Sequence, residues 1–231
     1  MDQDFPRTVA QKELDLLLAE QILAGGFRGA RLFEWRRARD QQWILGVLDC
    51  LGIKATAWDI EACLRGTAGR FLPEQREFAL IHGMRLVIDR LDDWAEGGTK
   101  PDAERLAGLY RLAAGKLPRV RKLGAEETPE IEALAPDPPA SQRHPVEQAG
   151  RVYQAILERA PFPDLNPLMA GLASSAVLLP SGYPPFMPQA VDEARLAAAM
   201  RATTSDSMES YARILFLRFV EVCEAVDRSA E

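Results

Sequence analysis

The sequence predicts an all-α protein, and two observations lead to that prediction. Apolar residues recur at spacings of three and four along most of the 231 residues, as they do in amphipathic helices. No series of alternating apolar and polar residues indicates β-strands, and no internal repeat appears. Hydrophobic residues make up 47% of the chain and charged residues 27%, so there is enough apolar material for a sizeable core. We therefore expect a helical bundle.

The expected helices follow one another along nearly the whole chain. Thr56 is expected to cap a short helix, because Asp59 follows three residues later as in a capping box. Pro73 suits the first turn of a long helix, and Gly97-Gly98 ends it. The last helix is apolar around much of its circumference and should be well buried. In chain order, the expected helices span about 11–23, 29–51, 57–65, 74–96, 102–114, 146–160, 168–179 and 206–227.

Residues 116–143 interrupt this pattern. They include five prolines and only short apolar pieces, so no helix of useful length fits there. We expect a short hairpin or an ordered flap, with a disordered loop as the alternative. We divide the chain into an N-terminal helical extension, residues 1–72, and a main domain, residues 73–231, onto which the extension can pack as one unit.

The composition restricts location and partners. A net charge of −6 gives no general attraction to nucleic acid, so we do not expect nucleic acid as a partner. Three widely spaced cysteines, Cys50, Cys63 and Cys223, indicate reduced thiols rather than disulfides or a metal site. No apolar stretch follows a basic N-terminus, and no run approaches the ~18 apolar residues of a membrane span. We expect a cytoplasmic protein that does not bind membranes.

The two histidines are weak candidates for chemistry. His82 lies within the 74–96 helix, and His144 precedes Pro145 at a helix start. Neither has a Cys, His or carboxylate at metal-ligand spacing, so we predict no metal site and expect structural or surface roles. No Ser-His-Asp pattern and no glycine-rich phosphate loop stands out.

Residues 45–66, LGVLDCLGIKATAWDIEACLRG, also fit a helix-turn-helix. Such a motif would place its second helix in a DNA groove. That helix carries Asp59 and Glu61 against a single arginine, Arg65, and phosphates repel carboxylates. A DNA-binding regulator is therefore the weakest of three functional hypotheses.

A second set of stretches is more specific. REFALIHGMRLVIDRL is followed by AERLAGLYRLAAG, a proline-rich EALAPDPPAS, APFPDLNP and LLPSGYPPFMP. The pairing of PDPP at 136–139 with GYPP at 182–185 is characteristic. From about Glu77 to Val222 this order resembles the Fic (Fido) family. The resemblance implies a Fic-like helical bundle with a short flap, and transfer of AMP or another phosphate-containing group to a protein hydroxyl.

The Fic motif, H-P-F-x-D/E-G-N-G-R-x-x-R, corresponds here to residues 160–171, APFPDLNPLMAG. The matching positions are Pro161, Phe162, Asp164 and Asn166. What the resemblance implies for them is a preserved loop shape, an aromatic anchor and one metal-facing carboxylate. Ala160 stands where the family has its general-base histidine, and general-base help is typically worth about 10²–10⁴-fold in rate.

The other departures from the motif also fall on its chemistry. Leu168 and Gly171 replace the two arginines that would hold the polyphosphate. Leu165 and Pro167 replace the two glycines, and Pro167 removes an N–H donor. Asn166 before Pro167 is instead a good helix cap. We therefore expect no bound metal and no cofactor, with ATP and Mg²⁺ relevant only if activity remains.

Some Fic proteins carry an inhibitory helix with the pattern S/T-x-x-x-E-G/N. AWDIEA, residues 57–62, looks like a worn version, with Glu61 at the glutamate position. The arginine with which it would pair is Leu168 here. The alternative is an ordinary solvated carboxylate on a helix.

Three hypotheses follow. The first is a Fic-like protein without nucleotidyl transferase activity, acting as a binding or regulatory pseudoenzyme with an unidentified protein partner. The second is a residual or altered Fic-type transferase, for which His144 is the only candidate base outside the loop. The third is the DNA-binding regulator. A homodimer is compatible with each of them.

Overall fold

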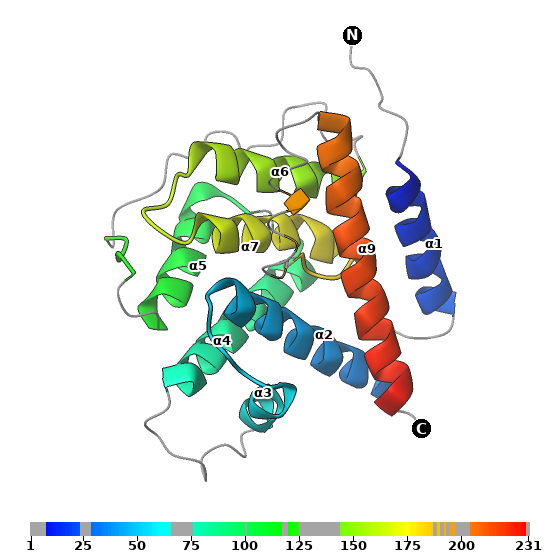
Figure 1. Cartoon of the computed structure of the whole chain (residues 1–231), viewed down its shortest axis with the longest axis horizontal. Helices are drawn as coiled ribbons and strands as arrows, with labels where there is room; N and C mark the ends of the chain where they lie inside the picture. Colours follow the sequence, from blue (N-terminus) through cyan, green and yellow to red (C-terminus); the bar gives the residue numbers. More distant parts are fainter. Residues whose placement is uncertain are drawn as a thin grey trace.

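The computed structural model describes most of the chain as helices. The described residues are 8–23, 29–65, 76–99, 101–116, 120–124, 144–186, 189, 192, 195–196 and 204–229. The helices (Figure 1) are α1 Val9–Leu23, α2 Gly29–Cys50, α3 Ala57–Leu64, α4 Arg76–Glu96, α5 Ala103–Lys116, α6 Pro145–Arg159, α7 Asn166–Leu178, the 3₁₀ turn η4 Leu179–Ser181 and α9 Thr204–Ser229. No strand occurs in these ranges, so the predicted all-α class is confirmed.

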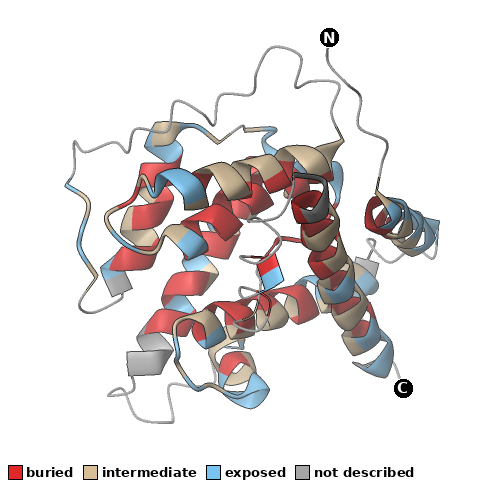
Figure 2. Cartoon of the chain, turned by 45° about the horizontal axis from the view of Figure 1, so that its top comes forward, coloured by how far each residue is buried: buried red, intermediate tan, exposed pale blue. Residues whose placement is uncertain are grey.

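The bundle is built around the hairpin of α6 and α7. These two helices pack along each other, and α4 and α5 both contact α7. Helix α9 crosses α6 and also packs against α1 and α2, so that α1 lies outermost, beyond α9 (Figure 1). Buried side chains of all these helices belong to one hydrophobic cluster, and the inward faces in Figure 2 meet in the same interior. As expected, α9 is well buried, with Tyr211, Leu215 and Phe219 almost inaccessible.

A close contact holds α9 against α6. Gly150 lies on the face of α6 towards α9, and a Cβ atom at this position would come within 2.8 Å of Met208 Sδ. Ser174 of α7 donates a hydrogen bond to the Ala149 carbonyl at 3.1 Å and also contacts the Tyr211 hydroxyl. The small side chains therefore set how closely the three helices approach.

The predicted cap of α3 is present. The Asp59 N–H donates to Thr56 Oγ1 at 3.2 Å, and the Thr56 N–H donates to Asp59 Oδ2 at 2.8 Å. These two bonds form a capping box. They lower the pKa of Asp59, since hydrogen bonds from the Thr56 side chain and backbone favour its charged form.

A charge network joins α2 to α4, and the sequence did not reveal it. Arg39 is 4% exposed and donates to Asp40 on its own helix and to Asp92 on α4, at 2.6–2.9 Å. Arg85 completes the network by pairing with Asp40 at 2.9 Å. Burial alone would lower the pKa of Arg39, but these carboxylates outweigh it and raise the pKa above its ordinary value.

Not every prediction falls on described residues. Most of the flap predicted at 116–143 lies outside them, and in residues 120–124 the backbone forms neither helix nor strand. The division at residues 72 and 73 stays a prediction, although α1, α2 and α3 share contacts with α4 and α9. Among the helices that the structure describes, none combines the length and apolar character needed to cross a membrane.

Candidate functional site at the turn between α6 and α7

The residues that resemble the Fic motif form a tight turn between α6 and α7, hereafter the motif turn (residues 160–165). Its first and last residues, Ala160 and Leu165, both have left-handed backbone conformations, with φ of 44° and 58°. A side chain costs about 1 kcal/mol or more in that region of the backbone map. Leu165 therefore keeps a backbone shape suited to glycine while lacking the glycine that the Fic motif has there.

Phe162 anchors the motif turn in the core. Its ring is 3% exposed and stacks on Tyr110 of α5, with centroids 5.3 Å apart and planes 11° from parallel. Such stacking adds to the apolar area that the ring buries. The aromatic position of the motif thus has a packing role here.

Asp164 ties the motif turn to the flap segment (residues 120–124). The exposed carboxylate accepts a hydrogen bond from the Arg121 backbone N–H at 2.8 Å. Tyr110 donates from its hydroxyl to the Arg121 carbonyl at 2.6 Å, so the same residue is held from both sides. Burial, together with the negative charge of Asp164, raises the pKa of Tyr110. One oxygen of the carboxylate expected to face a metal therefore holds the backbone of the flap segment.

Asn166 does not cap α7, which corrects the expectation from its position before Pro167. Leu165 is the N-cap residue, and no side chain caps this helix. The Asn166 amide turns back instead: its Oδ1 accepts from the Phe162 N–H at 3.0 Å, and its Nδ2 donates to the Phe162 carbonyl at 2.8 Å. This pair of bonds closes the motif turn on itself, because both polar groups of one backbone residue are satisfied by one side chain.

The two positions of the motif arginines lie in the core. Leu168 is 5% exposed, and Gly171 is buried. Ser175 donates to the Gly171 carbonyl at 2.7 Å, within α7. Ala160 and Pro167 are exposed, but neither carries a proton acceptor or donor on its side chain, and Pro167 lacks the N–H. These residues do not fit a magnesium-nucleotide complex, because they supply no guanidinium group and only one carboxylate, Asp164.

Comparison with solved structures decides the fold. No protein-family model matches the sequence, and curated proteins give no significant match. A Fic domain containing signaling protein from Bacteroides thetaiotaomicron is similar in structure with a TM-score of 0.74 at 13% identity, covering 94% of this chain and 97% of the other. A fragment of Fic-1 from C. elegans gives 0.71 at 16%, covering 94% and 72%. A Fic family protein from Desulfovibrio desulfuricans gives 0.63 at 18%, covering 100% and 78%.

The chain has a Fic fold. The coverage is nearly complete, so the structural similarity includes the N-terminal helices as well as the region that resembles the family in sequence. At these identities the likeness establishes the fold and leaves activity to the side chains.

Within this Fic fold, His144 lies at the wrong end of α6 to act as a base. It precedes α6, whereas Ala160 follows it. The 16 residue steps from His144 to Ala160 along the helix place the two positions about 24 Å apart, at 1.5 Å per residue. The suggestion that His144 supplies a base to the motif turn is therefore wrong.

His144 instead belongs to a polar cluster, hereafter the α1 anchor (His144, Asp15 and Tyr183). Its Nδ1 accepts from the Val146 N–H at 3.3 Å, which makes Nε2 the protonated nitrogen of the neutral ring. Nε2 lies 3.0 Å from Asp15 Oδ1, and the Tyr183 hydroxyl donates to the same oxygen at 2.5 Å. Sequence reasoning missed Asp15 and Tyr183, because they lie 129 and 39 residues from His144.

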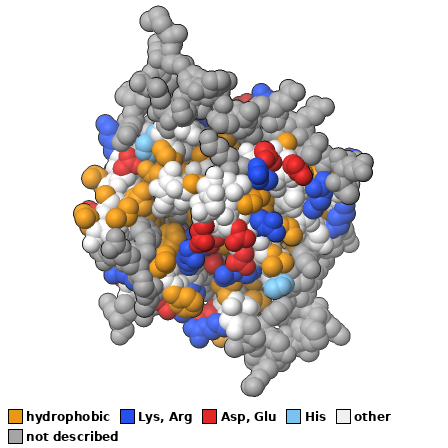
Figure 3. All heavy atoms as spheres, turned by 180° about the vertical axis from the view of Figure 1, so that it is seen from behind, with side chains coloured by type: hydrophobic (Ala, Val, Ile, Leu, Met, Phe, Trp, Pro, Cys, Tyr) orange, Lys and Arg blue, Asp and Glu red, His pale blue; other side chains and the backbone are white. Residues whose placement is uncertain are grey.

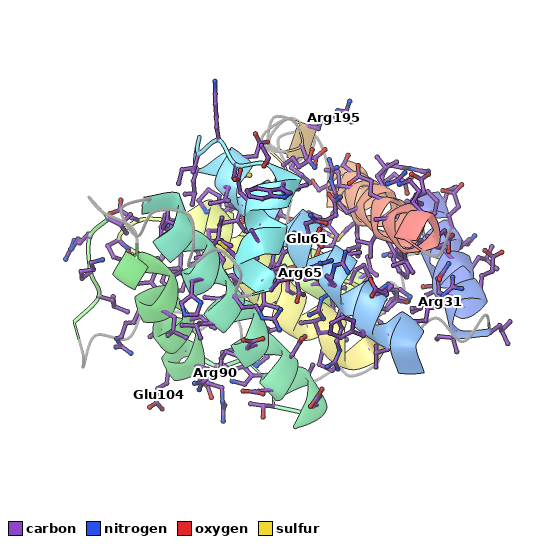
Figure 4. The ribbon with its side chains drawn as sticks, turned by 90° about the horizontal axis from the view of Figure 1, so that it is seen from below. Arg31, Glu61, Arg65, Arg90, Glu104 and Arg195 are labelled. Atoms are coloured by element: carbon purple, nitrogen blue, oxygen red, sulfur yellow. The ribbon has the colours of Figure 1, made fainter. Side chains whose placement is uncertain are left out.

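Glu61 lies apart from the motif turn. It pairs with Arg37 of α2 at 2.9 Å and with Arg65 at the end of its own helix (Figure 4). Figure 1 places α3 at the lower end of the bundle and the motif turn at its left edge. Its contacts match those of a solvated helical carboxylate that links two helices. The pair with Glu61 also engages Arg65, which is the single arginine of the second helix in the predicted helix-turn-helix.

The remaining candidates have ordinary surroundings. His82 is exposed on α4. Burial raises the pKa of Cys63 and of Cys223 to about 11, so both thiols stay protonated near neutral pH. In the part of the chain that the structure describes, no three His, Cys, Asp or Glu residues come together as a metal site would require.

Proposed function

We propose that this Fic-fold protein does not transfer nucleotides and acts as a binding or regulatory protein. The observation that carries the proposal is the hydrogen bond between Asp164 and the Arg121 N–H. Phosphoryl transfer depends on positioning and charge stabilisation by groups that face the phosphates. Here the carboxylate that the Fic motif would direct at a metal holds the flap segment in place.

Three further properties support the proposal. Ala160 cannot accept a proton from an attacking hydroxyl. Leu168 is buried where the motif has an arginine, and Gly171 has no side chain to offer. Pro167 has no N–H to bind an anion at the start of α7. Base, cation and backbone donor are thus replaced together.

The binding surface follows from the same contacts. The motif turn and the flap segment are held together by Asp164, by the Phe162–Tyr110 stack and by the Tyr110 hydroxyl. A surface that is ordered before binding loses little conformational freedom when a partner docks. We therefore propose a protein partner that docks on the motif turn and the flap segment. We also propose that it acts in the cytoplasm, where its three cysteines, which form no disulfide, would remain reduced.

The test is nucleotide transfer. The protein is incubated with ATP labelled at its α-phosphate and with Mg²⁺, and label on the protein and the thermal midpoint are measured. We expect no label and no shift in the midpoint. Label on the wild-type chain would overturn the proposal and restore the residual transferase.

A matched variant tests the position of the base separately from the other motif positions. Ala160→His restores a proton acceptor at an exposed position whose left-handed backbone histidine tolerates better than most residues. We expect it to remain inactive, because Leu168 and Gly171 still provide no cation. Activity in Ala160→His would show that the turn still holds a nucleotide, which contradicts the proposal.

A further inference from the structure

Helix α1 is apolar on two opposite sides. Its inner side buries Ala10, Leu14 and Leu18 against the bundle, and α9 is its main contact. Its outer side exposes Val9 by 61%, Leu16 by 65% and Leu23 by 87%. An amphipathic surface helix should have a polar outer side. The outer side of α1 is therefore not explained by the fold of a single chain.

Val9, Leu16 and Leu23 form one stripe, and a fourth exposed residue, Ile22, lies off it. The stripe residues are spaced by seven, and a straight helix drifts by only about 20° over seven residues. In Figure 2, α1 is seen nearly end-on, with its buried side towards α9 and its exposed side outward. In the view from behind, hydrophobic side chains gather at the edge where α1 lies (Figure 3). The stripe points away from the bundle, so another molecule can approach it along the full length of the helix.

The charges beside the stripe are arranged symmetrically about Leu16. Lys12 is four residues before it and Glu20 four residues after it, and both are exposed. If a second α1 runs antiparallel, with Leu16 facing Leu16 of the other copy, then Lys12 faces Glu20 and Val9 faces Leu23. Each copy makes the same contacts, as an isologous two-fold interface requires. The face is complementary to itself in both apolar character and charge.

The same charges are unfavourable for an isolated helix. The positive end of the helix dipole is the N-terminus, where anions are favoured, and cations are favoured at the C-terminus. Lys12 and Glu20 have the opposite arrangement within α1. A role in pairing two copies explains why the two charges lie this way round.

We propose that the outer face of α1 (Val9, Lys12, Leu16, Glu20 and Leu23) pairs antiparallel with the same face of a second copy. The 15 residues of α1 give a contact about 22 Å long. A single pair of helices of this length belongs to the small interfaces that support weak, reversible association. The proposal is independent of the motif turn, because it uses no residue of that turn.

Sedimentation of the full chain tests the pairing between about 1 µM and 1 mM, a range that covers weak association. We expect a monomer–dimer equilibrium. Leu16→Glu places two like charges opposite each other at the two-fold axis and should weaken association at least ~10-fold. The control Leu86→Glu, on α4 and 41% exposed in the wild type, should leave association unchanged.

A charge exchange identifies the partner as a second copy. Lys12→Glu and Glu20→Lys should each weaken association several-fold, because each brings like charges together. The double variant restores opposite charges and should return to within about twofold of the wild type. Folding should not suffer, since both substitutions suit the helix dipole.

Four outcomes would overturn the proposal. They are a wild-type monomer across the whole range, association that survives Leu16→Glu, association that Leu86→Glu abolishes as well, and a double variant no better than the single ones. The last would show that the face of α1 does not meet its own copy.

Discussion

The two ends of α6 differ in what holds them. At its N-terminal end, the α1 anchor brings together an imidazole, a carboxylate and a phenol. At its C-terminal end, the motif turn is held by an aromatic stack and by bonds to backbone groups. Three titratable side chains gather at the end where no reaction is expected, whereas Asp164 is the one ionisable side chain of the motif turn. A polar cluster is therefore not sufficient evidence of a catalytic site.

The largest effect should come from the aromatic stack. Phe162→Ala removes a buried ring and leaves a cavity beside Tyr110, which should lower the free energy of unfolding by about 3–5 kcal/mol. Urea unfolding measures this loss. The control Phe33→Ala removes a phenylalanine that is 66% exposed and should change stability by less than about 0.5 kcal/mol. Equal losses in the two variants would mean that the stack does not hold the motif turn.

A smaller effect is expected at the opposite end of α6. Tyr183→Phe removes the hydroxyl that donates to Asp15, a bond to a charged group, and should cost about 1–2 kcal/mol. Because Asp15 belongs to α1, hydrogen exchange should quicken in the amides of α1 and stay unchanged in the motif turn. Faster exchange in the motif turn would show that the two ends are coupled.

The smallest effect should be a gain in stability. Ala160 is exposed with a φ of 44°, so Ala160→Gly loses no packing and relieves a left-handed backbone. The free energy of unfolding should rise by about 0.5–1 kcal/mol. Ala19→Gly, an exposed position within α1, should instead lower it by about 1 kcal/mol, because glycine disfavours a helix interior. Thermal unfolding at low protein concentration compares the stabilities of the two variants. If both substitutions lowered stability, Ala160 would not be strained in the wild type.

The helices were predictable because their signals are local. Spacing of apolar residues located α1 to α7 and α9 but not the 3₁₀ turn η4, and the Thr56–Asp59 box was readable from two residues three positions apart. The contacts that define the site were not readable in this way. Asn166 could cap the helix or close the turn, and only the path of the backbone decides which.

Long-range polar contacts were missed for a related reason. Arg39 meets Asp92 across 53 residues, and His144 meets Asp15 across 129. Charged residues are mostly exposed, so a sequence gives no sign of the few that are buried with a partner. The motif positions were found through resemblance, and their departures from the Fic motif could be named from the residues. The bond from Arg121 to Asp164 required the structure, because it joins a backbone N–H to a carboxylate 43 residues away.

The length of α6 also determines how substitutions at its two ends combine in their effect on stability. Its ends lie about 22 Å apart, well beyond the distance at which the effects of two substitutions on stability usually interact. Substitutions in the motif turn therefore add to those in the α1 anchor without amplifying them. Residues 160–171 can therefore differ from the Fic motif at its histidine, arginine and glycine positions while α1 stays docked at the other end of the helix. A rigid helix keeps the two regions independent of each other.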